Sequence, residues 1–206
     1  VNLGPNVNGP EGDTDPCLSG DGLTLMFVSA RGKNWDIWVS RRENVRAPWS
    51  KAEKLGSEIN SDFAEFRPWL SRDGLRLTFM SLRPPREGVY VCRRNSPDDA
   101  FGTPGPFSRN HDRLALAGIS FSSDDRVVLC PRFDRVFPGN LLWLSRIDNP
   151  AEPFRNLVSF GPVVNVAAVD TAPVVSADGR IVYFQSDRPG GHGASDIWLT
   201  RRVPRP

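Results

Sequence analysis

Residues 13–42 read DTDPCLSGDGLTLMFVSARGKNWDIWVSRR, and residues 170–202 repeat this pattern as DTAPVVSADGRIVYFQSDRPGGHGASDIWLTRR. Both stretches contain a Ser-x-Asp-Gly turn, an alternating apolar segment that ends at Ser-x-Arg, and an Asp-Ile-Trp segment. Asp-Gly supplies the positive φ that a tight hairpin needs, and alternation of apolar and polar residues gives a strand two distinct faces. The pattern therefore predicts β-hairpins rather than helices.

The same turn recurs along the chain with a period close to 52 residues. The marker aspartates Asp21, Asp73, Asp124 and Asp178 lie 52, 51 and 54 residues apart. A period of this size is typical of repeat units that bury their apolar faces only against neighbouring units. We expect one domain over residues 1–206, built from four units at approximately residues 13–60, 61–112, 113–165, and 166–206 together with 1–12.

Each unit is predicted to form a sheet of four antiparallel strands. The first strand runs into the Ser-x-Asp-Gly turn, and the second follows that turn. The third carries a recurrent aromatic, as in residues 36–39 and 196–199, and the fourth runs from Trp49 to Leu55 in the first unit. Aromatic side chains at one register suit packing between sheets. The predicted fold class is therefore all-β, a four-bladed β-propeller.

The two ends of the chain complement each other. Residues 3–8 reproduce the Leu-Gly and Asn pattern of residues 55–60, which belongs to a fourth strand, whereas the last unit stops after its third strand. We expect residues 3–8 to pair as the outer strand beside residues 197–200, which closes the ring and leaves no long sheet edge exposed. The alternative is that the four units belong to a larger propeller, in which case the matching ends are a coincidence.

The composition supports short strands joined by tight turns, because 18 Gly, 19 Pro, 6 Trp and 12 Phe do not suit a helix bundle. The 26 basic and 24 acidic residues nearly cancel, so we expect no nucleic-acid partner. No run of about 18 apolar residues occurs, and residues 1–12 lack a secretory signal pattern, so we expect no membrane insertion. We expect a monomer.

Cysteines give no sign of a metal site or of a disulfide framework. Cys17, Cys92 and Cys130 show no CxxC spacing and are odd in number. Free Cys behaves as a small hydrophobe, so we expect three unbonded thiols. The sequence predicts no cofactor and no metal.

These repeats, in particular residues 13–42 and 170–202, resemble the TolB-like, WD-repeat-like β-propeller family over nearly the whole chain. The third copy departs from the pattern, with Asp125 in place of Gly and Cys130-Pro131-Arg132 in place of Ser-x-Arg. The resemblance implies a bacterial periplasmic or extracytoplasmic interaction module, on its own or within a larger protein that contains a kinase, a peptidase or another enzyme. Fold does not fix function, and the sequence shows no nucleotide loop, His-Arg-Asp loop or Gly-x-Ser-x-Gly elbow.

An acid stands at the start of the first strand in three units, on the face of a propeller where ligands usually bind. The acids are Asp13, Glu65 and Asp170. One interpretation is a cation or polar-ligand site, or a glycosidase pair in which two carboxylates about 5 to 9 Å apart share the acid and the base or nucleophile roles. The other is that each acid accepts bonds from its own loop or pairs with the recurrent Arg31, Arg83 or Arg188. We favour the second, because residues that recur in every blade serve the blade.

The same arginines have other candidate partners across the loop between the second and third strands. We expect Arg31 with Asp36, and Arg188 with Asp196, to bridge this loop, because the planar guanidinium fork suits a bidentate pair. In the second unit Gly88 replaces the acid, so Arg83 is free for a ligand or pairs with Glu87.

Residues that break the repeat are the better functional candidates. A Trp or Phe beside an Arg can stack on a sugar or anchor a peptide, although solvated loop residues are the alternative. His192 lies in a Gly-rich loop, but no helix follows, so we expect a hairpin loop rather than a phosphate site. The candidates that break the repeat are Trp35, Phe66, Arg67, Arg86, His111 and His192.

The sequence therefore predicts a non-catalytic binding or protein-interaction module that receives a protein segment or a small polar ligand on its axial face. The alternative is a small glycoside hydrolase that uses the acids of that face. The predicted ligand-binding residues are Asp13, Trp35, Glu65, Phe66, Arg67, Arg83, Asp170 and His192.

Overall fold

A computed structural model describes residues 1–107, 119–134 except 123 and 125, 139–146, 158–166, 169–176 and 180–201. The described residues form β-strands, turns and loops and contain no helix. The chain divides into two compact units, Val1–Phe107 and Ser108–Pro206, and each is described by itself. The all-β class predicted from the alternating segments is confirmed.

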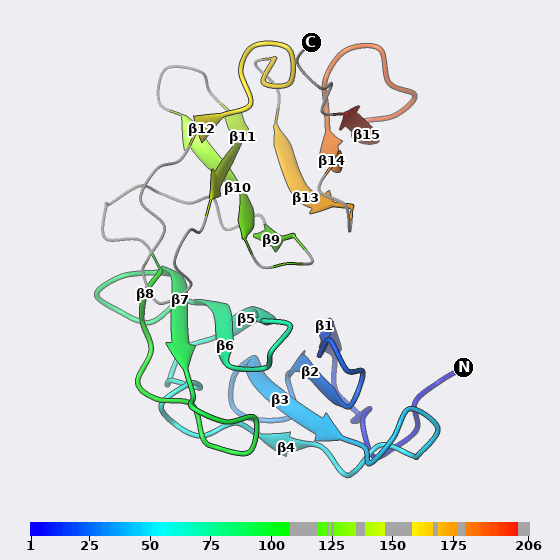
Figure 1. Cartoon of the computed structure of the whole chain (residues 1–206), viewed down its shortest axis with the longest axis vertical. Helices are drawn as coiled ribbons and strands as arrows, with labels where there is room; N and C mark the ends of the chain where they lie inside the picture. Colours follow the sequence, from blue (N-terminus) through cyan, green and yellow to red (C-terminus); the bar gives the residue numbers. More distant parts are fainter. Residues whose placement is uncertain are drawn as a thin grey trace. The chain divides into compact units, whose positions relative to one another are not determined.

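The first unit contains two antiparallel sheets of four strands, each with its strands in chain order (Figure 1). The hairpin of strands two and three keeps an unbroken register in both sheets, as Phe27 pairs with Trp38 and Phe79 pairs with Tyr90. One sheet comprises β1 (Asp13–Leu18), β2 (Thr24–Ser29), β3 (Asp36–Arg41) and β4 (Glu53–Lys54), and the other comprises β5 (Glu65–Leu70), β6 (Arg76–Ser81), β7 (Gly88–Arg93) and β8 (Gly105–Pro106).

The second unit contains one sheet of four strands and one of three. The four-stranded sheet comprises β9 (Ser120–Phe121), β10 (Val127–Asp134), β11 (Gly139–Arg146) and β12 (Val158–Ser159), and the three-stranded sheet comprises β13 (Asp170–Val175), β14 (Ile181–Ser186) and β15 (Asp196–Arg201). The predicted positions of the second and third strands are confirmed in all four sheets.

The outer strands are shorter than predicted. In the first sheet only Glu53–Lys54 pairs with β3, whereas the sequence predicted a strand from Trp49 to Leu55. On either side of this pair single bonds remain, from the Ser50 amide to the Arg41 carbonyl and from the Leu55 amide to the Ile37 carbonyl, and the Ala52 amide donates to the Asn6 carbonyl.

The predicted outer strand at residues 3–8 is not formed. In this segment the amides of Val7 and Asn8 both donate to the carbonyl of Gly4, which makes a tight turn. Val7 is buried against Leu25 and Phe27 of the first sheet. In the described part of the chain β15 pairs only with β14, so the predicted ring closure is absent from the sheet pairings.

The Ser-x-Asp turn is fixed by a recurrent hydrogen-bond network. Ser19 Oγ donates to Asp21 Oδ1 at 2.6 Å and accepts from the Thr24 amide at 2.8 Å. Gly22 has φ +74°, a conformation that a side chain would strain. The third copy keeps the network without a glycine, because Ser122 Oγ donates to Asp124 Oδ1 at 2.5 Å and accepts from the amide of residue 127 at 2.9 Å.

A β-bulge interrupts the inner strand of three sheets. The registers of β1, β5 and β13 shift in the middle, and the bulged residue has positive φ although it is not glycine. A proline follows each one and has no N–H to give to the ladder, which explains its tolerance at a bulge. The bulged residues are Asp15 (φ 49°), Arg67 (φ 52°) and Ala172 (φ 46°).

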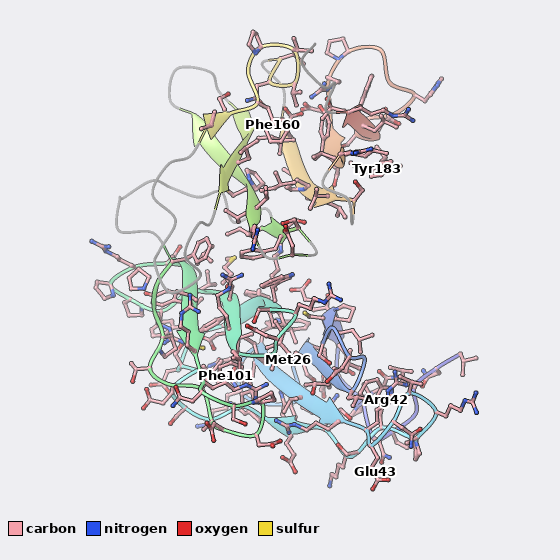
Figure 2. The ribbon with its side chains drawn as sticks, in the orientation of Figure 1. Met26, Arg42, Glu43, Phe101, Phe160 and Tyr183 are labelled. Atoms are coloured by element: carbon pink, nitrogen blue, oxygen red, sulfur yellow. The ribbon has the colours of Figure 1, made fainter. Side chains whose placement is uncertain are left out.

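Apolar side chains between the sheets form the cores. In the first unit Met26 and Ile37 pack against Leu77 and Phe79, and Met26 lies inside the cluster (Figure 2). In the second unit Leu129 and Leu142 pack with other apolar side chains of that unit. The alternation read from the sequence supplies these faces, because every second residue of a strand points to the same side.

Candidate functional site

Glu65, the first residue of β5, is fully buried and its two carboxylate oxygens are both bound. Its Oε1 accepts from Ser61 Oγ at 2.6 Å and from Ser81 Oγ at 2.7 Å, and its Oε2 accepts from the Ser61 amide at 3.1 Å. Arg83 Nη2 lies 3.4 Å from Oε1 and forms the ion pair. Because four donors surround a buried carboxylate, the group is a satisfied structural ion.

Asp13 occupies the same position in the first sheet. Its Oδ1 accepts from Arg31 Nη2 at 2.6 Å, and its Oδ2 accepts from the Gly9 amide at 2.9 Å. Burial raises the pKa of this carboxyl, but hydrogen bonds from Ser29, Arg31 and Gly9 outweigh it, so the pKa lies below the ordinary value. The carboxylate form is therefore the stable one.

Asp170 repeats the pair in β13 with one difference. Its Oδ1 accepts from Arg188 Nη2 at 2.9 Å, and the residue is fully buried. Its Oδ2 has no hydrogen-bond partner among the described residues. In the other two sheets the corresponding oxygen accepts from a backbone amide, that of Gly9 or that of Ser61.

The three arginines are held by the same four interactions. In the first sheet Arg31 Nε donates to Ser29 Oγ at 2.8 Å, Nη2 donates to the Val7 carbonyl at 2.5 Å, and the guanidinium lies 4.8 Å from the ring centroid of Trp38. Arg83 donates in the same way to Ser81 Oγ and the Ile59 carbonyl, and Arg188 donates to Ser186 Oγ and the Val164 carbonyl. Each guanidinium group is therefore bound by oxygen acceptors and by an aromatic ring of its own unit.

The pairing of each acid with its recurrent arginine is confirmed, and the other predicted arginine partners are wrong. Asp36 pairs with Lys54 Nζ at 2.7 Å instead of with Arg31. Arg83 pairs with Glu65 instead of Glu87 and is not free for a ligand. Ser29 lies opposite Asp13 on β1 and opposite Asp36 on β3, and Arg31 binds Asp13 while Lys54 binds Asp36.

The Gly-rich loop before β15 surrounds a carboxylate of its own chain. Asp196 Oδ2 accepts from the amides of His192 at 2.8 Å and Gly193 at 3.1 Å, so Asp196 does not pair with Arg188. A side chain at Gly191 would displace this carboxylate, because a Cβ there would overlap the same oxygen. The expectation of a hairpin loop is confirmed, and the anion that the loop binds is internal.

Trp35, directly before β3, and Phe66, in β5, bring the two sheets of the first unit into contact. Their ring centroids lie 6.2 Å apart with an interplanar angle of 36°. The Trp35 carbonyl accepts from the Glu65 amide at 2.8 Å, and a Cβ on Gly12 would lie 2.9 Å from the Trp35 ring, so the indole is fixed in place. Trp35 is still 36% exposed.

Arg67 follows Phe66 on β5, and its backbone bonds to Asp15 on β1. The Arg67 amide donates to Asp15 Oδ2 at 3.0 Å, and both residues sit at the positive-φ bulge. Sequence reasoning missed Asp15. The signal was available, because Asp15 and Arg67 hold the same position two residues after the acid and directly before a proline. We call Asp15, Trp35, Phe66 and Arg67 the aromatic rim.

The remaining candidates do not join the rim. The His192 side chain is exposed, and its backbone amide donates to Asp196 Oδ2. Arg86 is exposed, and its carbonyl accepts from Tyr90 Oη at 2.8 Å. His111 lies outside the described residues. Within the described ranges no group of His, Cys, Asp and Glu could hold a metal ion, the three cysteines are free, and no helix is long and apolar enough to span a membrane.

No protein-family model and no curated protein matches the sequence. Among solved structures, the chain is similar to TolB from Acinetobacter baumannii, with 14% identity and a TM-score of 0.66 over 95% of this chain and 42% of that one. It is similar to a putative TolB from Agrobacterium tumefaciens, with 20% identity and a TM-score of 0.60 over 94% and 59%. It is also similar to a puromycin-hydrolyzing peptidase from Mycobacterium tuberculosis, with 14% identity and a TM-score of 0.63 over 95% and 28%.

The chain spans less than two thirds of the length of each of these proteins. Sequence identities of this size show similarity of fold only. Antiparallel sheets in sequential order, repeated along an all-β chain, agree with these neighbours. The chain therefore has the β-propeller fold of the TolB-like proteins.

Proposed function

We propose that the chain is a non-catalytic binding module, a monomeric domain of four propeller blades that receives a polar ligand or a protein segment at the aromatic rim. One contrast carries the proposal. The recurrent acids are bound to arginines inside the sheets, whereas the rim offers a fixed, partly exposed indole with charged groups beside it.

The state of the acids argues against a glycosidase. A general acid at neutral pH needs a raised pKa, whereas the pKa of Asp13 is lowered. Glu65 is fully buried and both of its oxygens accept hydrogen bonds from its own sheet, so a sugar has no access route to it. A catalytic role would require these ion pairs to open, which costs several kcal/mol for a buried pair.

The rim has the features of a preorganised recognition surface. Trp35 is held through its backbone and against Gly12, so binding pays little entropy to order it. Asp15 and Arg67 supply an acceptor and a cation on rigid strands rather than on a flexible loop. Aromatic and Arg side chains dominate binding energy in protein interfaces, and the same groups hold sugars by stacking and hydrogen bonds.

The test is isothermal calorimetry of the chain against neutral and acidic oligosaccharides and short peptides, followed by single substitutions. We expect Trp35→Ala and Phe66→Ala to weaken binding of any hit by at least tenfold. Phe63→Ala is the matched control, because Phe63 is exposed in the same unit and makes no ring contact with Trp35 in the described structure. Equal affinity in wild type and both rim variants would overturn the proposal, as would hydrolysis of a glycan that Glu65→Gln abolishes.

A further inference from the structure

Asp36, the first residue of β3, is a buried carboxylate that relies on one cation. Its side chain is fully buried, and its Oδ2 accepts from Lys54 Nζ at 2.7 Å. Its Oδ1 has no hydrogen-bond partner among the described residues. The Lys54 side chain, on β4, is 43% exposed, so the anion lies inside the sheet while the cation reaches solvent. The charge of Asp36 is therefore balanced by a single partner that is free to leave it.

Two comparable acids have several donors each. Glu65 accepts from the hydroxyl groups of two serines and from a backbone amide, in addition to its arginine. Asp196 lies opposite Ser186 as Asp36 lies opposite Ser29, and its Oδ2 accepts from two amides of its own loop. Among these three acids, only Asp36 depends on one exposed side chain.

The loop that carries Trp35 lies directly against this ion pair. A Cβ on Gly32 would lie 2.8 Å from Asp36 Oδ2 and 3.9 Å from Lys54 Nζ, so the backbone of the loop is close to both groups. Trp35 immediately precedes Asp36, and its carbonyl accepts from the Glu65 amide at 2.8 Å. A carboxylate that moved out to reach water would therefore displace both the loop and Trp35.

We propose that Lys54 is a positioning residue of the aromatic rim, whose ammonium group keeps Asp36 inside the sheet and thereby keeps Trp35 against Phe66. The inference rests on the proposed recognition role of the rim and names the group that keeps the rim preorganised. A buried charge without its partner is far less stable than a neutral group of the same shape. Loss of the ammonium group therefore drives the Asp36 carboxylate toward solvent, at the residue where the pairing of β3 with β2 ends.

The proposal predicts an asymmetry between the two partners. Lys54→Met keeps an unbranched side chain but leaves the buried carboxylate unpaired, so Trp35 should move. Asp36→Asn removes the buried charge and leaves a lysine that already reaches solvent, so Trp35 should stay in place. The double variant Asp36→Asn with Lys54→Met contains no buried charge either, so it should also keep Trp35 in place.

Fluorine NMR of the chain labelled with fluorotryptophan follows Trp35 without any ligand. The Trp35 resonance is assigned by its disappearance in Trp35→Phe. In Lys54→Met we expect this resonance to shift toward its position in the urea-unfolded chain, whereas in Asp36→Asn and in the double variant it should keep its wild-type position. Lys51→Met is the matched control, because it removes the same charge from an exposed side chain that precedes β4. The resonance of Trp69, on β5, is the internal reference.

Three results would overturn the proposal. The first is a Trp35 resonance that does not shift in Lys54→Met, and the second is an equal shift in Lys51→Met. The third is a double variant in which Trp35 is displaced as far as in Lys54→Met, because Lys54 would then act through packing and not through charge. If Lys54→Met does not fold, the double variant decides alone: a native Trp35 resonance supports the proposal, and a displaced one refutes it.

Binding of ligands at the rim is measured separately by calorimetry, so the two proposals can fail independently. A displaced Trp35 in Lys54→Met, in a chain whose wild type binds none of the ligands, would refute the binding module and support the positioning role. An undisplaced Trp35 in Lys54→Met, in a chain whose wild type binds a ligand through Trp35, would refute the positioning role alone.

Discussion

Replacing Glu65 with Gln tests whether the recurrent acids serve the scaffold. The substitution keeps the size of the side chain but removes its charge and puts an amide donor where Oε1 or Oε2 accepts from Ser61, Ser81 and Arg83. Glu65 is fully buried, and the Arg83 side chain is 18% exposed, so the arginine would lose its counter-charge with little access to water. We expect a loss of about 3 kcal/mol in the free energy of unfolding.

Urea denaturation at neutral pH, followed by far-UV circular dichroism, measures this loss. Glu58→Gln is the matched control, because the Glu58 side chain is exposed and surface changes usually stay within about 0.5 kcal/mol. Functional groups are often held at a cost to stability, so a ligand-binding carboxylate would lose binding without losing stability. A Glu65→Gln variant as stable as the control would refute the scaffold role.

Three further outcomes follow from the hydrogen bonds and the backbone. The pKa of Asp13 lies below its ordinary value of 3.8, so the carboxylate contributes its full stabilisation of the fold above that pH and loses it as the pH falls through the lowered pKa. The difference in melting temperature between wild type and Asp13→Asn should therefore shrink on acidification. A constant difference would contradict this. Burial raises the pKa of Cys92 to about 12, so Cys92 should resist a thiol reagent at pH 8 in the folded chain. The denatured, unreduced chain should titrate three thiols, and a single titratable thiol would reveal a disulfide. Gly74 has φ +72°, so Gly74→Ala should lower the free energy of unfolding by about 1–2 kcal/mol. Gly56→Ala is the control and should lower it less, because a Cβ there meets no atom within 4 Å and Gly56 lacks a positive φ. Equal losses in urea denaturation would argue against turn strain.

The hairpins were predictable from the sequence because they depend on local chemistry. Ser19, Asp21 and Gly22 fix a turn through bonds that span only a few residues, and the alternation on either side sets which face is buried. The length of the outer strands was not predictable, because the regular pairing covers only Glu53–Lys54 while single bonds from Ser50 and Leu55 continue the contact with β3.

In the candidate site, too, local features were predictable from the sequence and contacts between distant residues were not. Sequence spacing favours Asp36, the nearer acid, as the partner of Arg31, but Asp36 binds Lys54 of the outer strand and Arg31 binds Asp13. The positive φ at Asp15 could not be read from residue type, because glycine is the usual marker of that conformation. The contact between Trp35 and Phe66 joins two repeats, and no local pattern announces it.

Comparison of equivalent positions separates scaffold from recognition. The bulge keeps its backbone conformation at Asp15, Arg67 and Ala172, yet the three side chains are an acid, a base and a methyl group. Likewise Trp35, which precedes Asp36, corresponds to Glu87 and Ser195 in other units. If these side chains stabilised the blade, one residue type would recur, as arginine does at positions 31, 83 and 188. Because the backbone is repeated while the side chain it presents is not, we infer that these positions are where the repeat is free to carry specificity, and the aromatic rim lies at them.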